Sequence, residues 1–95
     1  MREFKYDYTI CPDNNPKEFK GVCAIIGRAF SDFQKKDLLI DVDGSTIQVF
    51  EYDGLMIVVY DDYDEGAVYV KSDIDLKDIL TKRALGQQPR KVAFA

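Results

Sequence analysis

The sequence predicts an α+β domain in which one long helix packs on a face of a mainly antiparallel sheet of four to five strands. Three observations carry this prediction. Apolar runs of strand length recur along the chain, an amphipathic segment with helical spacing follows the first of them, and two Asp-Gly dipeptides separate later ones. The expected order of elements is β-α-β-β-β-β-α.

The first two elements are a strand and a helix. The strand is expected over residues 4–10, where Phe4, Tyr6, Tyr8 and Ile10 alternate with polar residues. The helix is expected to begin at Pro16 and to reach Phe30, because Asn15 is a favourable N-cap and a proline suits the first helical position. Its apolar residues recur at the spacing of one helical stripe and define the face that packs on the sheet: Phe19, Val22, Cys23, Ile26 and Phe30.

Four further strands are expected over residues 38–42, 46–52, 55–60 and 67–70. Asp43-Gly44 separates the first two and Asp53-Gly54 the next two, and Asp-Gly favours tight hairpin turns that need positive φ angles. The four runs should therefore form a β-meander. Residues 55–59 are apolar on both faces and should be the central strand, whereas residues 38–42 alternate and should have one face in water.

A short second helix is expected after residues 72–75, with Leu76, Ile79 and Leu80 on one side and Gly86 as its C-terminal stop. We therefore assign residues 1–86 to a single domain and residues 87–95 to a C-terminal tail. Val92 and Phe94 alternate in that tail, which leaves an extra edge strand and an irregular end equally open.

The residues that catalysis and cofactor binding commonly need are scarce. The chain contains no histidine, the commonest general base and a frequent zinc ligand, and no phosphate-binding glycine motif. Cys11 and Cys23 have no activating neighbours in sequence and are expected to be reduced thiols, with one disulfide as the lesser alternative. We expect a non-catalytic protein with no cofactor and no metal site. The longest apolar run, residues 55–60, is too short to cross a membrane, so a cytoplasmic location is expected, in a host cell if the gene is carried by a phage.

Charge is distributed very unevenly. Between Asp37 and Asp78 the chain carries twelve acidic residues against two basic ones, a net charge of −10, although the whole chain is only −4. Such a surface attracts basic proteins and repels nucleic acid and membranes. Successive turns of a meander fall at alternate ends of the sheet, so the turn at Asp43 and the loop over residues 61–66 should share one end. The residues expected to bind a partner there are Asp41, Asp43, Asp61, Asp62, Tyr63, Asp64, Glu65 and Tyr69.

These patterns lead to the hypothesis of a small acidic inhibitor or regulator that docks on a basic protein, for example a nuclease or another nucleic-acid-binding protein. Phage anti-defence proteins, such as anti-CRISPR or anti-restriction proteins, and toxin-immunity proteins are examples of this class. The alternatives are an assembly subunit that uses an apolar sheet face, a weak divalent-cation-binding domain, and acidic turns that only keep the protein soluble. The oligomeric state stays open, a homodimer included.

Overall fold

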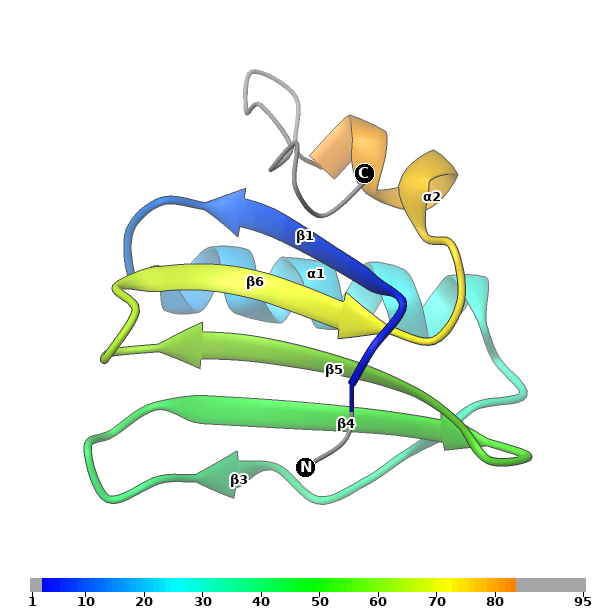
Figure 1. The fold of residues 1–95 in the computed structure, drawn as a ribbon, viewed down its shortest axis with the longest axis horizontal. Coiled ribbons are helices and arrows are strands. Elements are labelled where there is room, and N and C mark those ends of the chain that lie inside the picture. The colour runs from blue at the N-terminus through cyan, green and yellow to red at the C-terminus, as the bar shows by residue number, and fades with distance from the viewer. Residues whose placement is uncertain (1–2, 84–95) are drawn as a thin grey trace.

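A computed structural model describes residues 3–83, and it confirms the α+β fold (Figure 1). The sheet is antiparallel throughout and has the strand order β1-β6-β5-β4-β2, with β3 also paired to β4. The main helix packs against one face of this sheet. In chain order the elements are β1 (Tyr6–Cys11), α1 (Pro16–Ala29), β2 (Gln34–Lys35), β3 (Leu39–Ile40), β4 (Thr46–Tyr52), β5 (Leu55–Asp62), β6 (Ala67–Ser72) and α2 (Lys77–Arg83).

Helix α1 begins where the sequence predicts. The Asn15 side chain accepts a hydrogen bond from the Glu18 amide at 3.1 Å, and Pro16 occupies the first helical position. At the other end the Phe30 amide donates to the Ile26 carbonyl at 2.9 Å. The buried side chains of α1 lie on the predicted stripe and face the sheet: Phe19, Val22, Cys23 and Ile26.

Strands β4, β5 and β6 form the predicted meander. Gly44 and Gly54 have φ angles of 90° and 83°, which few residues other than glycine adopt readily. This explains why glycine follows aspartate in both turns. Strand β5 lies in the middle of the sheet, and Ile57 and Val59 on its helix side have no exposed surface. With β1 and α1 they form one core, whose largest fully buried members include Phe50, Ile10 and Ile26.

Helix α2 is tied to β1 through one hydroxyl group. The Tyr8 hydroxyl donates to Asp75 Oδ1 at 2.9 Å and accepts a hydrogen bond from the Leu76 amide at 2.8 Å. Asp75 Oδ1 also accepts from the Lys77 amide at 2.9 Å, and this bond, with that from Tyr8, lowers the pKa of the Asp75 carboxyl. Burial raises the pKa of Tyr8 to about 12. Tyr8 thus joins the start of α2 to the sheet.

The strand expected over residues 38–42 is present but shorter than predicted, and the expectation that one of its faces is buried is wrong. Within that range only Leu39 and Ile40 pair with β4, as strand β3. An unexpected strand, β2, pairs with β4 earlier in the chain, at Gln34 and Lys35. Leu38, Leu39, Ile40 and Val42 are all exposed. Lys35 and Leu39 are four residues apart in sequence, whereas their partners on β4, Phe50 and Ile47, are three residues apart. The edge therefore contains one extra residue, which forms a β-bulge. The side chain of Gln48 donates to the Lys36 carbonyl at 2.5 Å and holds this bulge in place.

Among residues 3–83, no helix covers the face of the sheet opposite α1 (Figure 1). A shallow hollow of about 320 Å³ lies on it, lined mainly by apolar residues of β4 and β5: Phe4, Ile47, Val49, Met56, Val58, Tyr60 and Lys71. Phe4 belongs to the segment before β1, which crosses in front of the sheet (Figure 1). We call this surface the open face.

Two expectations fall on residues 84–95, outside the described part of the chain, namely the helix stop at Gly86 and the edge strand around Val92 and Phe94. Within residues 3–83 no helix is both long and apolar enough to cross a membrane.

Replacing Tyr8 with Phe should lower the free energy of unfolding by about 1–2 kcal/mol, because the buried Leu76 amide loses its acceptor. Urea unfolding measures the loss, and amide exchange at Leu76 should accelerate more than exchange in β5. Tyr52→Phe is the control, since Tyr52 is 48% exposed at the end of β4. Equal effects of the two substitutions would contradict the assigned role of the Tyr8 hydroxyl.

Candidate functional site at the acidic end of the sheet

The turn between β3 and β4 and the loop between β5 and β6 meet at one end of the sheet, as the alternation of meander turns predicts (Figure 1). The Tyr63 amide donates to the Ser45 hydroxyl at 2.8 Å, and Ser45 is buried. The Tyr63 ring lies against Gly44, where an added Cβ would stand only 2.9 Å from the ring atom Cε2. The two segments are therefore packed together. We call this surface, residues 41–45 and 62–66, the acidic end.

Carboxylates of the first turn help to build it. Asp41 Oδ1 accepts from the Val42 amide at 2.7 Å, and Asp43 Oδ1 accepts from the Ser45 amide at 2.9 Å. Local bonds of this kind are the reason aspartate favours turns. Asp41 and Asp43 are nevertheless exposed, so they also contribute negative charge to the surface.

Asp62 organises the second loop. Its Oδ1 accepts from the amides of Asp64 and Glu65 at 2.9 and 3.2 Å, and its Oδ2 accepts from the Tyr69 hydroxyl at 2.6 Å. The Tyr69 bond is the main cause that lowers the pKa of the Asp62 carboxyl, and burial together with the same bond raises the pKa of Tyr69. The Tyr69 ring stacks on Tyr60 with ring centres 4.6 Å apart. The loop is thus anchored to the open face.

Two residues expected at the partner-binding surface are buried instead. Asp61 is 3% exposed, because it shares the helix side of β5 with Ile57 and Val59. Its Oδ1 accepts from Asn14 Nδ2 at 2.9 Å, and the same amide group donates to the Asp62 carbonyl at 2.9 Å. Tyr69 is 7% exposed under the loop. Neither can present its side chain to a partner without a change of structure.

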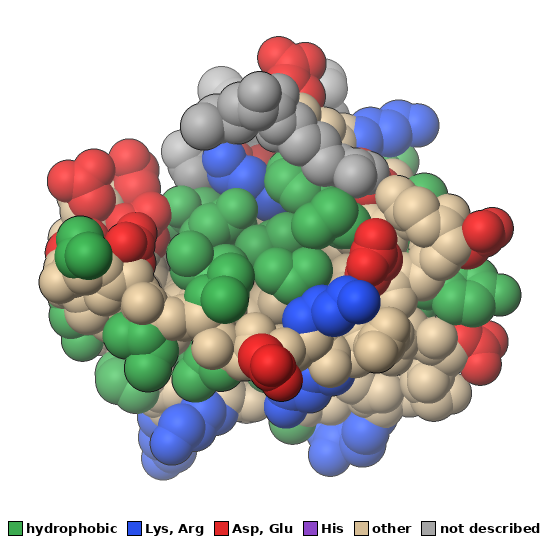
Figure 2. Space-filling view, turned by 90° about the horizontal axis from the view of Figure 1, so that it is seen from below, with side chains coloured by type: hydrophobic (Ala, Val, Ile, Leu, Met, Phe, Trp, Pro, Cys, Tyr) green, Lys and Arg blue, Asp and Glu red, His purple; other side chains and the backbone are tan. Residues whose placement is uncertain are grey.

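The exposed residues of the acidic end combine charge with apolar area. Acidic side chains gather at the left end in Figure 2, with hydrophobic side chains beside them. Tyr63 is 49% exposed, and Val42, which the sequence did not single out, is fully exposed at the tip of the turn. Of the expected residues, those that reach the surface are Asp41, Asp43, Tyr63, Asp64 and Glu65, with Asp62 partly exposed.

Sequence reasoning missed the residues that hold this end together, Ser45 and Asn14. The sequence contains only part of the information needed to predict their roles. Alternate residues of a strand share one face, so Asp61 lies on the same face of β5 as Ile57 and Val59. The sequence thus predicts a buried carboxylate that needs a hydrogen-bond donor. Which residue donates depends on the path of the loop after β1, and the local sequence does not specify that path.

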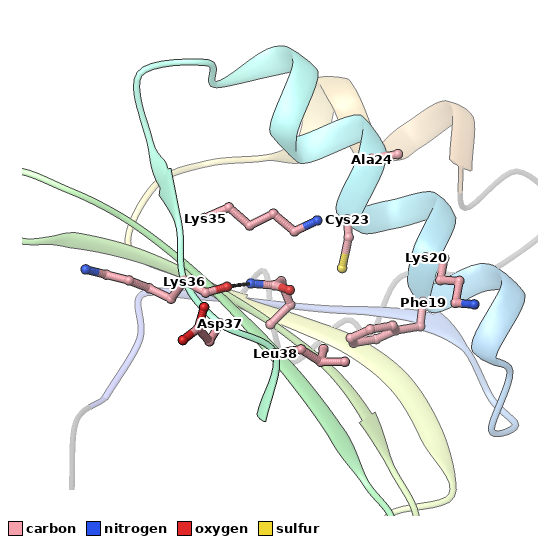
Figure 3. Close-up of a pocket in the computed structure, with 9 residues that line it drawn as sticks. Phe19, Lys20, Cys23, Ala24, Lys35, Lys36, Asp37 and Leu38 are labelled. Carbon is pink, nitrogen blue, oxygen red and sulfur yellow. Dashed lines mark hydrogen bonds between the residues drawn. The ribbon is translucent and has the colours of Figure 1, made fainter. Parts of the chain in front are cut away.

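A second hollow, of about 470 Å³, lies between α1 and the edge strands (Figure 3). The amino group of Lys35 extends toward Cys23 (Figure 3). Burial raises the pKa of the Cys23 thiol to about 11, and the charge of Lys35 offsets this only in part, so the thiol is protonated at neutral pH and is a weak nucleophile. Cys11 is also a free thiol, in agreement with the expected reduced state.

No group of three or more potential metal-ligating His, Cys, Asp or Glu side chains comes together within residues 3–83.

The chain was compared with protein-family models, with curated proteins and with solved structures. None of these three comparisons finds a match.

Gly44→Ala should destabilise the protein by about 2–3 kcal/mol, because it combines a positive φ angle with a clash against Tyr63. Gly54→Ala is the matched control, since its φ is similarly positive but nothing lies within 4 Å of the added Cβ. The difference between the two free energies of unfolding isolates the contact between the turns. Identical losses would show that Tyr63 does not pack on Gly44.

Asp62→Asn should lower the free energy of unfolding at neutral pH by about 1–2 kcal/mol, because a carboxylate accepts the three bonds better than an amide. The folded-state pKa of Asp62 is below that of an aspartate in an unfolded chain, so its stabilising effect is fully present above the unfolded-state pKa and is lost as pH falls through the folded-state pKa. Chemical unfolding from pH 7 to pH 2 should therefore bring the two proteins together at the acidic limit. Asp64→Asn is the control, and a pH-independent difference for Asp62→Asn would exclude this role.

Proposed function

We propose that this protein is a small acidic docking protein that uses the acidic end to bind a basic surface of another protein. The observation that carries the proposal is the joining of two acidic turns through Tyr63, Ser45 and Gly44. This places carboxylates from two separate segments on one surface that exists before binding. A preorganised surface loses less conformational entropy on association than a flexible acidic tail.

The composition of this surface also favours a protein partner. Tyrosine is enriched at interfaces, because its large ring gives contact area while few torsion angles become fixed on binding. Tyr63 and Val42 are exposed among the carboxylates, so the surface offers apolar contacts within a charged surround. Charge alone would steer encounter, and the apolar contacts would slow dissociation.

A basic groove that ordinarily holds nucleic acid is the kind of partner we favour. In such a groove lysine and arginine side chains bind phosphates, and carboxylates can take the place of those phosphates. An inhibitor or regulator of a nuclease or nucleic-acid-binding protein, of the anti-defence or toxin-immunity kind, would work in this way. The proposed action is competition, since occupied cationic side chains are no longer accessible to nucleic acid.

A second candidate function, that of an assembly subunit, rests on the open face. The side chains of Ile47, Val49, Met56 and Tyr60 there are only partly covered, and Phe4 contributes to the same hollow. An apolar sheet face of this kind can bury a partner by the hydrophobic effect, and such binding depends weakly on salt. Salt dependence therefore separates the two candidates.

The double substitution Asp64→Lys with Glu65→Lys should weaken partner binding about tenfold or more, because both side chains are exposed and the change reverses local charge. The protein is first used to capture partners from the native cell or its host, and a captured partner is then purified. Stopped-flow measurement of its association rate constant should show a steep fall with rising ionic strength.

Asp32→Lys provides the control, since Asp32 is exposed in the connector after α1, outside the acidic end. It should change the association rate only slightly. An association rate constant that changes neither with ionic strength nor with the charge reversal at Asp64 and Glu65 would exclude electrostatic docking. Loss of binding on Val49→Lys, with indifference to salt, would favour the assembly subunit.

A further inference from the structure

The edge of the sheet formed by β3 is apolar and exposed. Leu38, Leu39 and Ile40 are 48%, 53% and 70% exposed, so three consecutive large apolar residues face water. Figure 2 looks onto the molecule from this side and shows hydrophobic side chains reaching the surface. Natural edge strands usually carry charged residues that oppose pairing with other chains. This edge lacks that protection at its centre.

Side chains of this edge lie on both faces of the sheet. Leu39 is paired with Ile47 and therefore shares the open face with it. Leu38 lies on the side of α1, where it lines the hollow together with Phe19 (Figure 3). A strand that is apolar on both faces is typical of the interior of a sheet, so β3 has the composition of a strand with two neighbours.

The backbone of β3 also has an unused side within the described part of the chain. The Asp41 amide donates to the Ser45 carbonyl at 2.8 Å, so Asp41 and, by alternation, Leu39 direct their polar groups toward β4. The N–H and C=O groups of Leu38 and Ile40 then point away from β4. No strand of residues 3–83 lies on that side. Groups arranged in this way can pair with another strand.

The charges around this edge are ordered along the chain. Lys35, Lys36 and Asp37 precede the apolar centre and have a net charge of +1, and Asp41 and Asp43 follow it and have a net charge of −2. A segment with a positive start and a negative end is complementary to an antiparallel copy of itself, because each positive end then meets a negative end. Lys36 already pairs with Glu51 at 3.3 Å, and the amino group of Lys35 extends toward Cys23, so Lys35 would have to turn outward to act as the cation of such a contact.

We propose that residues 38–40 pair with the same residues of a second copy of this chain, in antiparallel orientation, to form a two-fold symmetric dimer with one continuous sheet. Leu38 of each copy exchanges backbone hydrogen bonds with Ile40 of the other, and Leu39 packs beside its own symmetry mate. The basic segment that precedes residues 38–40 in each copy then lies near the acidic turn that follows them in the other. Asp37 opposite Asp41 is the like-charge pair of this register, and it lies at the solvated margin, where salt screens it.

This dimer goes beyond the proposed function and does not require it. Asp64 and Glu65 lie on the loop between β5 and β6, outside the paired segment, so they stay available to a different partner. A monomer that still docks through its acidic end would contradict the dimer alone. A dimer that binds no docking partner would contradict the proposed function alone.

Ile40→Pro tests the pairing most specifically, because proline removes the outward amide and is tolerated at edge positions whose N–H faces solvent. Sedimentation equilibrium of the wild-type protein, up to millimolar concentration, should show a concentration-dependent dimer. Ile40→Pro should raise the dimer dissociation constant about tenfold or more while the thermal unfolding midpoint changes little. Leu39→Lys should have the same effect, and Lys35→Asp a smaller one.

Leu55→Lys is the matched control, since Leu55 is also an exposed apolar residue, at the opposite end of the sheet. It should leave dimerisation unchanged. In the wild-type protein the Leu38 and Ile40 amides should exchange more slowly as concentration rises. A protein that stays monomeric at millimolar concentration would overturn the proposal, and so would a dimer that Ile40→Pro and Leu39→Lys leave intact.

Discussion

The pairing of β4 with β5 is the constraint on which the rest of the structure depends. Its register runs from Tyr52 opposite Leu55, next to the Gly54 turn, to Thr46 opposite Asp61 at the far end. Once this register is set, Ser45 lies beside the chain that continues into Tyr63, and the two acidic segments meet. A slip by one residue would move Ile57 and Val59 out of the core. Core packing and the acidic end are therefore fixed by the same ladder.

Buried polar groups link this ladder to the segments around it. Asp61 accepts from Asn14, Gln48 donates to the Lys36 carbonyl, and Ser45 accepts from the Tyr63 amide. Each bond connects the sheet end or edge with a loop that has little apolar area of its own. Leaving any of these groups unpaired in a buried position would be costly, so the bonds define where the loops lie. The acidic end gains its fixed shape from this polar framework rather than from the core.

Much of the fold could be predicted from local patterns, because those patterns act over a few residues. Asn15 and Pro16 define the start of α1, and Gly44 and Gly54 supply the positive φ angles of the turns. The edge could not be predicted in this way. Leu38, Ile40 and Val42 alternate as in a half-buried strand, but whether their face meets a helix depends on the lateral extent of α1, which is a tertiary property. The pairing of β1 with β6 is likewise a contact between the two ends of the domain.

The candidate site was predictable in its charge and less so in its geometry. The meander order places the turns at one end, and five of the eight expected residues are exposed there: Asp41, Asp43, Tyr63, Asp64 and Glu65. Asp61 and Tyr69 are buried because strand parity and loop packing override the rule that charged and polar residues stay outside. Asp62 acts chiefly inside its own loop, through its bonds to Asp64, Glu65 and Tyr69.

The central claim is that the acidic end is one preformed surface, and amide hydrogen exchange tests it most directly. The Tyr63, Asp64 and Glu65 amides donate to Ser45 and Asp62. In the free protein all three should exchange well below the rate of an unstructured chain, and Tyr63 should lose its protection in the Ser45→Ala variant. Exchange of these three amides at the unstructured rate, with β5 still protected, would contradict the claim.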